Sequence, residues 1–169
     1  MANILINALV ALLLGGATLN FSFEAEAAGG AGAPAASGNS VSQYVTQGTI
    51  VTAGGKYRME TQDALVLSDG VVMCIYQKAI DEVILQEAAA GAAGIANPFA
   101  ILIGSDSNYD VAASEADAQG IPRKIVLKAK SGAKYTIKIK SYNKLPQVDM
   151  QQFVFRAEDF PTAVVTDLR

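Results

Sequence analysis

The stretch LVLSDGVVMCIYQKAIDEVILQE, residues 65–87, carries the clearest fold signal in this chain. Two apolar runs flank Ser68-Asp69-Gly70, and an Asp-Gly pair between apolar runs is a strong short-range signal for a β-hairpin. A second turn, near residues 77–80, leads into another apolar run. The stretch therefore predicts consecutive antiparallel strands over residues 64–67, 71–76 and 82–86.

Further strands are predicted on both sides of that stretch. Apolar and polar residues alternate there with the period of two that is typical of a half-buried strand. Short turns at Gly54-Gly55 and at residues 131–133 join two pairs of these strands. The pattern predicts a mainly β (α+β) fold with a curved antiparallel sheet of about eight strands. The additional strands are predicted for residues 19–25, 41–53, 56–61, 124–130, 134–141 and 153–155.

Two short helices are predicted beside the sheet. Residues 2–14, ANILINALVALLL, place apolar side chains at helical spacing, and Gly15-Gly16 ends the pattern. This run is too short to span a membrane, and the absence of Lys or Arg before it disfavours a secretory signal. We therefore expect a mature domain that begins with an amphipathic or buried helix. Asn97-Pro98 predicts the start of a second helix, over residues 99–103.

The composition indicates one folded domain, residues 1–169, and disfavours most enzyme classes. Of the 169 residues, 51% are hydrophobic and 17% are charged, unlike a disordered chain. Histidine is absent, which removes His-based nucleophile activation and every zinc site that needs imidazole. Residues 106–117 begin like a calcium loop but carry Val111 and Asp117 where Gly and Glu are required, so they are interpreted as a turn. We therefore expect no enzyme, no metal and no cofactor.

Basic residues are concentrated late in the chain, although the net charge is −3. Ten of the thirteen Lys and Arg residues lie from Arg123 onward. Most of these lysines alternate with apolar residues and have no aromatic stacking surface beside them. They are therefore interpreted as the solvated face of two strands, and no nucleic acid is expected as a partner. Glu24 and Glu26 are likewise interpreted as solvated charges on the polar face of the strand over residues 19–25.

The predicted sheet has too little helix to cover it. If the sheet curls, two short helices cannot fill the space under its concave face at native packing density, which predicts an apolar cavity beneath a helical lid. A closed β-structure packed solid by its own side chains is an equally good interpretation of the pattern alone. A two-residue turn at Asp69-Gly70 pairs Leu65 with Cys74. We therefore expect Leu65, Leu67 and Cys74 on the concave face, with Cys74 as an inert thiol.

Residues 65–87 also resemble a known family when they are taken with three other runs: GTIVTAGGKYRME at 48–60, ANPFAILIG at 96–104 and FPTAVVTDLR at 160–169. In this order the runs resemble the periplasmic outer-membrane lipoprotein carrier proteins, the LolA family. The resemblance implies an incomplete antiparallel β-barrel closed by a helical lid. It also implies that residues 109–123 are short of a strand pair found in longer members, so a smaller barrel is expected.

The same resemblance implies a function, partners and a location. The protein would hold the acyl chains of lipoproteins and ferry them through the periplasm from the inner to the outer membrane, as a monomer. Its partners would be acylated lipoproteins, an inner-membrane lipoprotein-releasing transporter and an outer-membrane lipoprotein receptor. Two alternatives stay open: a lipid-binding sensor module of the same superfamily, and a structural or adhesive β-domain that binds no lipid.

Candidate residues for the acyl-chain cavity follow from the resemblance and from the predicted strand faces. Tyr57 and Met59 match the strand whose aromatic positions face the cavity in the family. Phe99 and Leu102 match the lid helix that contains the NPF motif, and two leucines of the first helix would belong to the same lid. The full set is Leu9, Leu13, Phe21, Phe23, Tyr57, Met59, Leu65, Leu67, Cys74, Phe99, Leu102, Ile137 and Ile139.

Overall fold

The computed structural model describes residues 2–26, 43–88, 99, 102 and 108–169 of the chain. The described part consists mainly of strands, with one α-helix and two short 3-10 helices. Its elements are α1 (Ala2–Gly15), β1 (Ala17–Glu26), β2 (Gln43–Ala53), β3 (Lys56–Thr61), β4 (Ala64–Ser68), β5 (Val72–Gln77), β6 (Glu82–Glu87), β7 (Tyr109–Ala116), β8 (Pro122–Ala129), β9 (Lys134–Lys144), η1 (Met150–Phe153), η2 (Ala157–Asp159) and β10 (Val164–Asp167).

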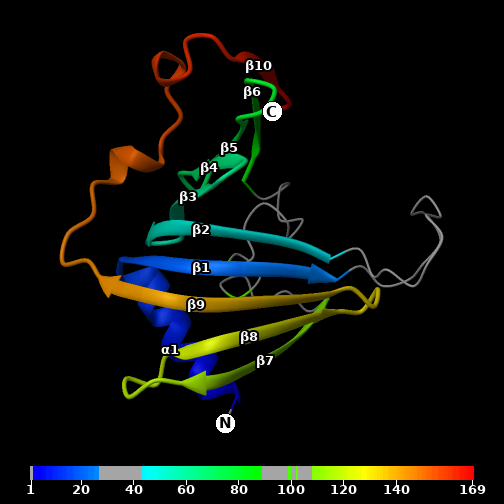
Figure 1. The fold of residues 1–169 in the computed structure, drawn as a ribbon. Helices are drawn as coiled ribbons and strands as arrows, with labels where there is room; N and C mark the ends of the chain where they lie inside the picture. Colours follow the sequence, from blue (N-terminus) through cyan, green and yellow to red (C-terminus); the bar gives the residue numbers. More distant parts are fainter. Residues whose placement is uncertain (1, 27–42, 89–98, 100–101, 103–107) are drawn as a thin grey trace, which may run out of the picture.

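The strands form one ten-stranded sheet in the order β10-β6-β5-β4-β3-β2-β1-β9-β8-β7. Neighbouring strands are antiparallel, except that β10 runs parallel to β6. The sheet is strongly curved, but its two edge strands, β7 and β10, do not pair with each other, so the barrel is incomplete (Figure 1). The predicted fold class, a curved and mainly antiparallel sheet with few short helices, is confirmed.

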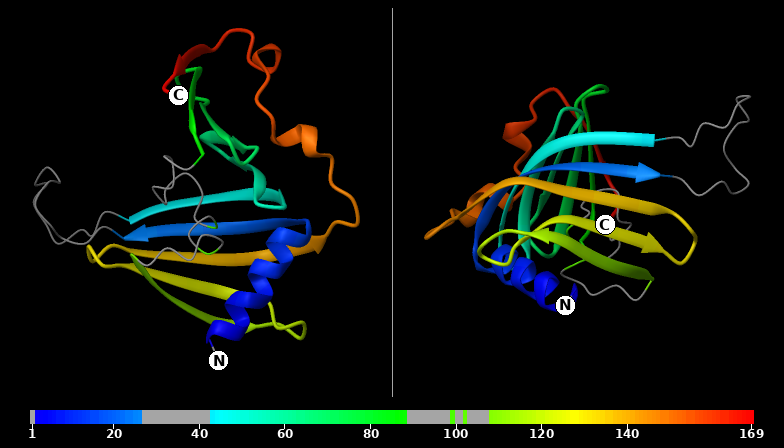
Figure 2. Two further views of the ribbon diagram at one scale, coloured as in Figure 1. Left: turned by 180° about the vertical axis from the view of Figure 1, so that it is seen from behind. Right: turned by 60° about the horizontal axis from the view of Figure 1, so that its bottom comes forward.

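Helix α1 crosses one face of the sheet and contacts β1, β2, β7 and β8 (Figure 2). Three hydrogen bonds fix the C-terminal end of α1 and Gly16 to β2, to the β2–β3 turn and to the residue after β9. The Thr52 hydroxyl donates to the Leu13 carbonyl at 3.2 Å, the Gly54 N–H to the Leu14 carbonyl at 2.9 Å, and the Leu145 N–H to the Gly16 carbonyl at 3.0 Å. Gly16 has a φ of 103°, which glycine adopts without steric cost, and the chain turns there into β1.

No helix in the described part of the chain is long and apolar enough to cross a membrane. The second predicted helix, over residues 99–103, lies largely outside the described residues. Phe99 and Leu102 are described, are helical and are buried.

The β4–β5 hairpin has a different register from the one predicted. Cys74 pairs with Leu67 instead of Leu65, and Ser68 pairs with Met73. The turn lies one residue later along the chain because the Asp69 carboxylate accepts hydrogen bonds from the N–H groups of Val71 and Val72, at 2.9 and 2.8 Å. The partner of Cys74 thus moves by two residues along β4, from Leu65 to Leu67, and residues two apart in a strand point to the same face. Cys74 therefore still shares a face with Leu65 and Leu67.

The later part of the chain differs from the predicted strands in two places. Residues 109–116, for which no strand was predicted, form β7, where Tyr109, Val111 and Ala113 pack on the core between exposed neighbours. The alternation is weak in the sequence because three of these residues are alanines. Residues 153–155 do not form a strand: the Asp149 side chain accepts from the Gln151 N–H and starts η1, and the last strand is β10.

Candidate functional site

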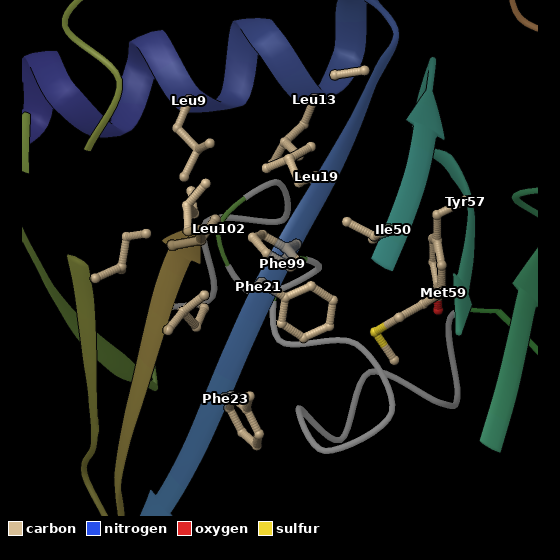
Figure 3. Packing of buried hydrophobic residues seen from close by; sticks show 14 of the residues in the cluster. Leu9, Leu13, Leu19, Phe21, Phe23, Ile50, Tyr57, Met59, Phe99 and Leu102 are labelled. Atoms are coloured by element: carbon tan, nitrogen blue, oxygen red, sulfur yellow. The ribbon is translucent and has the colours of Figure 1, made fainter. Parts of the chain in front are cut away.

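The main apolar core lies on the concave side of the sheet, and we call it the inner cluster. It joins buried side chains from α1, from most of the strands and from the segment that contains Phe99 and Leu102 (Figure 3). The side chains of Leu9 and Leu13 reach from the helix toward the strands. Its members are Leu9, Leu12, Leu13, Ala17, Leu19, Phe21, Phe23, Ile50, Tyr57, Met59, Val66, Met73, Phe99, Leu102, Ile121, Ile125, Leu127, Ile137 and Ile139.

The contacts inside the cluster are those of an apolar interior. The rings of Phe21 and Phe99 meet edge to face, with centroids 5.2 Å apart and an interplanar angle of 88°. The Tyr57 hydroxyl donates to the Met73 sulfur at 3.2 Å, which gives a buried phenol a partner. The cluster contains no Asp, Glu, Lys or Arg, and the described residues bring no three potential metal ligands together. This surface is suited to apolar contact.

The structure brings ten of the thirteen candidate residues together in the inner cluster. Their role in binding an acyl chain stays a prediction, but their common position on the concave face supports it. These ten are Leu9, Leu13, Phe21, Phe23, Tyr57, Met59, Phe99, Leu102, Ile137 and Ile139.

The other three candidates, Leu65, Leu67 and Cys74, lie on the opposite face of the sheet, so their placement on the concave face is corrected. The β3–β4 register opposes Met59 to Val66 and Tyr57 to Ser68, which turns the intervening β4 side chains outward. There they form an outer cluster with Val83 and Leu85, packed against Phe155, Phe160 and Ala163 of the C-terminal segment. The sequence could not choose between two apolar faces.

Burial makes Cys74 unreactive. Its side chain is almost completely buried, and desolvation raises the pKa of the thiol to about 11. At pH 8 on the order of one thiol in a thousand is ionised, and the thiolate is the reactive form. The prediction of an inert thiol is therefore consistent with the structure.

We expect a maleimide to label Cys74 slowly, and at the same rate with and without an acyl ligand, because the residue lies in the outer cluster. The substitution Phe160→Ala should speed labelling severalfold, because Phe160 belongs to the aromatic layer that packs against the outer cluster and so helps to bury Cys74. In that layer its ring contacts Tyr76 and Phe155 at centroid distances of 4.9 and 5.7 Å. Ile4→Ala, in an exposed position on α1, is the control. The measurement is the mass shift over time at pH 8. Protection by an acyl ligand would show that Cys74 faces the concave side.

Several residues of the inner cluster were missed at the sequence level. Ile50 and Leu127 each have a polar neighbour on one side only, Thr49 and Lys128, so their strand patterns contain a weak signal that could have found them. Val66 and Met73 carry no such signal, because the residues on both sides of them are also apolar. Only the pairing of β4 with β3 and β5 places these two side chains on the concave face.

The convex face of β1 and β9 is polar, as predicted. Lys138 and Lys134 pair with Glu24 and Glu26, each at 3.5 Å, and all four side chains are at least one quarter exposed. Ion pairs with this much exposure contribute little to stability. At β1 and β9 the sheet therefore has an apolar face toward α1 and a charged face away from it.

Comparison with known proteins identifies the class of this fold. No protein-family model and no curated protein matches the chain. Among solved structures, a LolA superfamily protein from Nitrosomonas europaea matches with a TM-score of 0.59 and 9% identity, over 91% of this chain and 97% of that chain. An uncharacterized conserved protein from Thermus thermophilus matches with a TM-score of 0.55 and 8% identity, over 98% of both chains.

The class is thus an incomplete β-barrel that packs a helix against its concave face. More particularly, the chain has a LolA-like fold. The resemblance to the LolA family noted in the sequence is confirmed at the level of the fold.

Proposed function

We propose that the protein is a periplasmic carrier that binds the acyl chains of lipoproteins between its concave sheet and α1. The observation that carries the proposal is the inner cluster: a large apolar face of an open sheet whose described cover is one 14-residue helix together with Phe99 and Leu102. The likeness in fold to a LolA superfamily protein supports the same role. The carrier would act as a monomer and without catalysis, receiving lipoproteins from an inner-membrane transporter and delivering them to an outer-membrane receptor.

Apolar burial is strong enough to hold such a cargo. Each buried methylene contributes about 0.8 kcal/mol, so a long acyl chain gains on the order of 10 kcal/mol. In the closed structure the side chains of Leu9, Leu13 and Phe99 already occupy the concave side. An acyl chain that displaces them exchanges one apolar contact for another, which lowers the net affinity below the gross value. This competition would make release possible.

The attachment of α1 provides the movement that the proposal needs. The three hydrogen bonds to the strands all lie at its C-terminal end, beside Gly15 and Gly16. Toward the N-terminus the packing is looser, and Ile4 is 70% exposed. Swinging about Gly15-Gly16 would lift Leu9 and Leu13 from the sheet and break the bonds to the Leu13 and Leu14 carbonyls, while the bond to the Gly16 carbonyl remains. The helix would then act as a lid with its hinge at one end.

Hydrogen exchange should report this opening. We expect the amides of α1 to exchange faster than those of β1, and to slow when an acyl ligand is added. Thr52→Val removes the bond to the Leu13 carbonyl and should speed exchange in α1 further. The matched control is Thr49→Val: Thr49 lies in β2 like Thr52, and its substitution removes an exposed hydrogen bond to the Asn20 side chain of β1. Equal protection of α1 and β1 in the free protein would contradict the lid mechanism.

The test of the function is binding of an acylated peptide. In native mass spectrometry, the delipidated protein should bind a palmitoylated peptide and fail to bind the same peptide without its acyl chain. The matched pair isolates the contribution of the chain. Absence of any difference between the two peptides would refute acyl-chain binding.

One observation favours a different function, a structural β-domain with a solid core. The members of the inner cluster are at most 7% exposed without any ligand, as in an ordinary protein interior. Such a domain would bind neither peptide. A sensor of the same superfamily would bind the acylated peptide but would not pass it on, so transfer of the bound peptide to acceptor vesicles separates the sensor from the carrier.

A further inference from the structure

A pocket of about 580 Å³ opens beside α1, between the helix, the turn at residues 117–121 and the end of β9. Its volume lies within the range of roughly 300 to 1,000 Å³ that is usual for small-ligand sites. The helix wall of the pocket contains Leu12 and three small residues, Ala8, Ala11 and Gly15, which leave the space unfilled.

The remaining walls of the pocket are held in place. The Asp117 carboxylate accepts from the N–H groups of Gln119 and Ile121 at 3.0 Å, and Arg123 and the Tyr142 hydroxyl also donate to it. These bonds fix the turn. On the other side, the bond from the Leu145 N–H to the Gly16 carbonyl ties the end of β9 to the end of α1. The pocket is therefore built from ordered parts of the fold.

The inner cluster reaches the surface in this pocket. Leu12 and Ile121 line the pocket and also belong to the inner cluster, and each is at most 5% exposed. The remaining wall residues are mostly apolar or small. An apolar chain lying on Leu12 and Ile121 would thus have a continuous apolar surface leading under α1.

One charged side chain lines the pocket. Lys144 is exposed there, and no carboxylate of the described residues lies within 4 Å of its ammonium group. The nearby Asp117 is already engaged by Arg123 and Tyr142. A cation at the rim of an apolar pocket matches a ligand with an apolar chain and an anionic head.

We propose that this pocket is the port of the lipid site, where the head of an anionic amphiphile stays beside Lys144 while its acyl chain runs inward past Leu12 and Ile121. The inference rests on the proposed function for the inner part of the site and adds to it the charge of the ligand head. The anionic group can belong to a free lipid or to an acidic residue next to an acylated peptide terminus.

The test compares cis-parinaric acid with its methyl ester in fluorescence titrations at pH 8, since the two differ in charge and share the chain. The wild-type protein should bind the acid about threefold tighter, as expected for one exposed charge pair, and high salt should remove the preference. Lys144→Gln should abolish the preference and leave binding of the ester unchanged. Lys140→Gln, which removes a lysine of the convex face, should keep it.

The outcomes separate the two proposals. If neither probe binds, the proposed function fails. If both bind the wild-type protein equally, acyl binding stands and the inference about Lys144 is wrong. The inference is also wrong if Lys144→Gln lowers thermal stability but keeps the preference, because Lys144 would then only balance the C-terminal end of the α1 dipole, which has no basic residue in its last turn.

Two further measurements identify the source of the anion and the path of the chain. Palmitoylated peptides with Asp or Asn after the acylated residue should differ threefold if peptide heads use the port; a preference confined to the parinaric pair assigns it to free lipids. Ala11→Leu, which narrows the pocket, should slow association of the ester severalfold, whereas Asn7→Leu, exposed on the same helix, should not. An unchanged rate in Ala11→Leu would overturn the port.

Discussion

Replacing Phe21 by alanine is expected to lower the free energy of unfolding by about 3–5 kcal/mol, the range for removing a large aromatic side chain from a packed core. Phe21 is 1% exposed at the centre of the inner cluster, and its ring meets Phe99 edge to face. The substitution removes that contact and leaves a cavity that the curved sheet cannot close. Urea unfolding followed by far-UV circular dichroism gives the value.

The matched control for this loss is Phe160→Ala. Phe160 is the same residue type but is only half-buried, where it packs against the outer cluster. Its truncation should cost about 1–2 kcal/mol, since less apolar area is lost. If Phe21→Ala lowered the free energy of unfolding by less than Phe160→Ala does, the inner cluster would be loosely packed in the free protein. That result would also remove the main alternative to a ligand cavity, a solid core.

Gly48→Ala is expected to cost about 3 kcal/mol, at the upper end of the usual range for overpacking. Gly48 lies opposite Phe21 in the β1–β2 ladder. A β-carbon there would lie 2.5 Å from the Glu60 carbonyl oxygen, 3.0 Å from a Thr61 methyl carbon and 3.2 Å from the Phe21 ring. The carbonyl belongs to the backbone of β3, so it can retreat only if β2 and β3 move apart. Thermal unfolding measures the effect.

Gly15→Ala is the control for Gly48→Ala. A β-carbon at Gly15 meets no heavy atom within 4 Å, and the residue ends α1. This substitution should raise stability by about 0.5–1 kcal/mol, because alanine loses less backbone freedom than glycine on folding. If both glycine variants lost stability equally, backbone entropy or helix-end geometry would be responsible, and the close approach of β2 and β3 would not be the cause.

Local patterns in the sequence were sufficient to predict α1 and most of the strands, and the resemblance to the LolA family implied the open curved sheet. They failed where the outcome depended on pairing between distant segments. In β4 both faces are apolar, so only its pairing with Met59 of β3 decides that Val66 points inward and Leu67 outward. The strand β10 was missed for the same reason, since Val164 pairs with Glu82, about eighty residues earlier.

The candidate site was predictable to a similar extent. Alternation along β1 and β9 placed Phe21 and Ile137 on the concave face, because those strands have one polar face. The pocket beside α1 was not predictable, because it is defined by side chains that are small. Ala8 and Ala11 carry no sequence signal that distinguishes a pocket wall from an ordinary helix surface. Lys144 lies beside the same pocket only because β9 pairs with β1, which follows α1 in the chain.

The central position of β1 has a consequence for how the chain folds. Strands β2 to β6 form one meander and β7 to β9 another, each from neighbours in sequence, whereas β1 pairs with β9 across more than a hundred residues, as Phe21 does with Ile139. Local hairpins form quickly, and long-range pairings slowly. We expect the union of β1 with β9 to limit the folding rate. Because α1 continues directly into β1, its contacts with β7 and β8 form only in that last step.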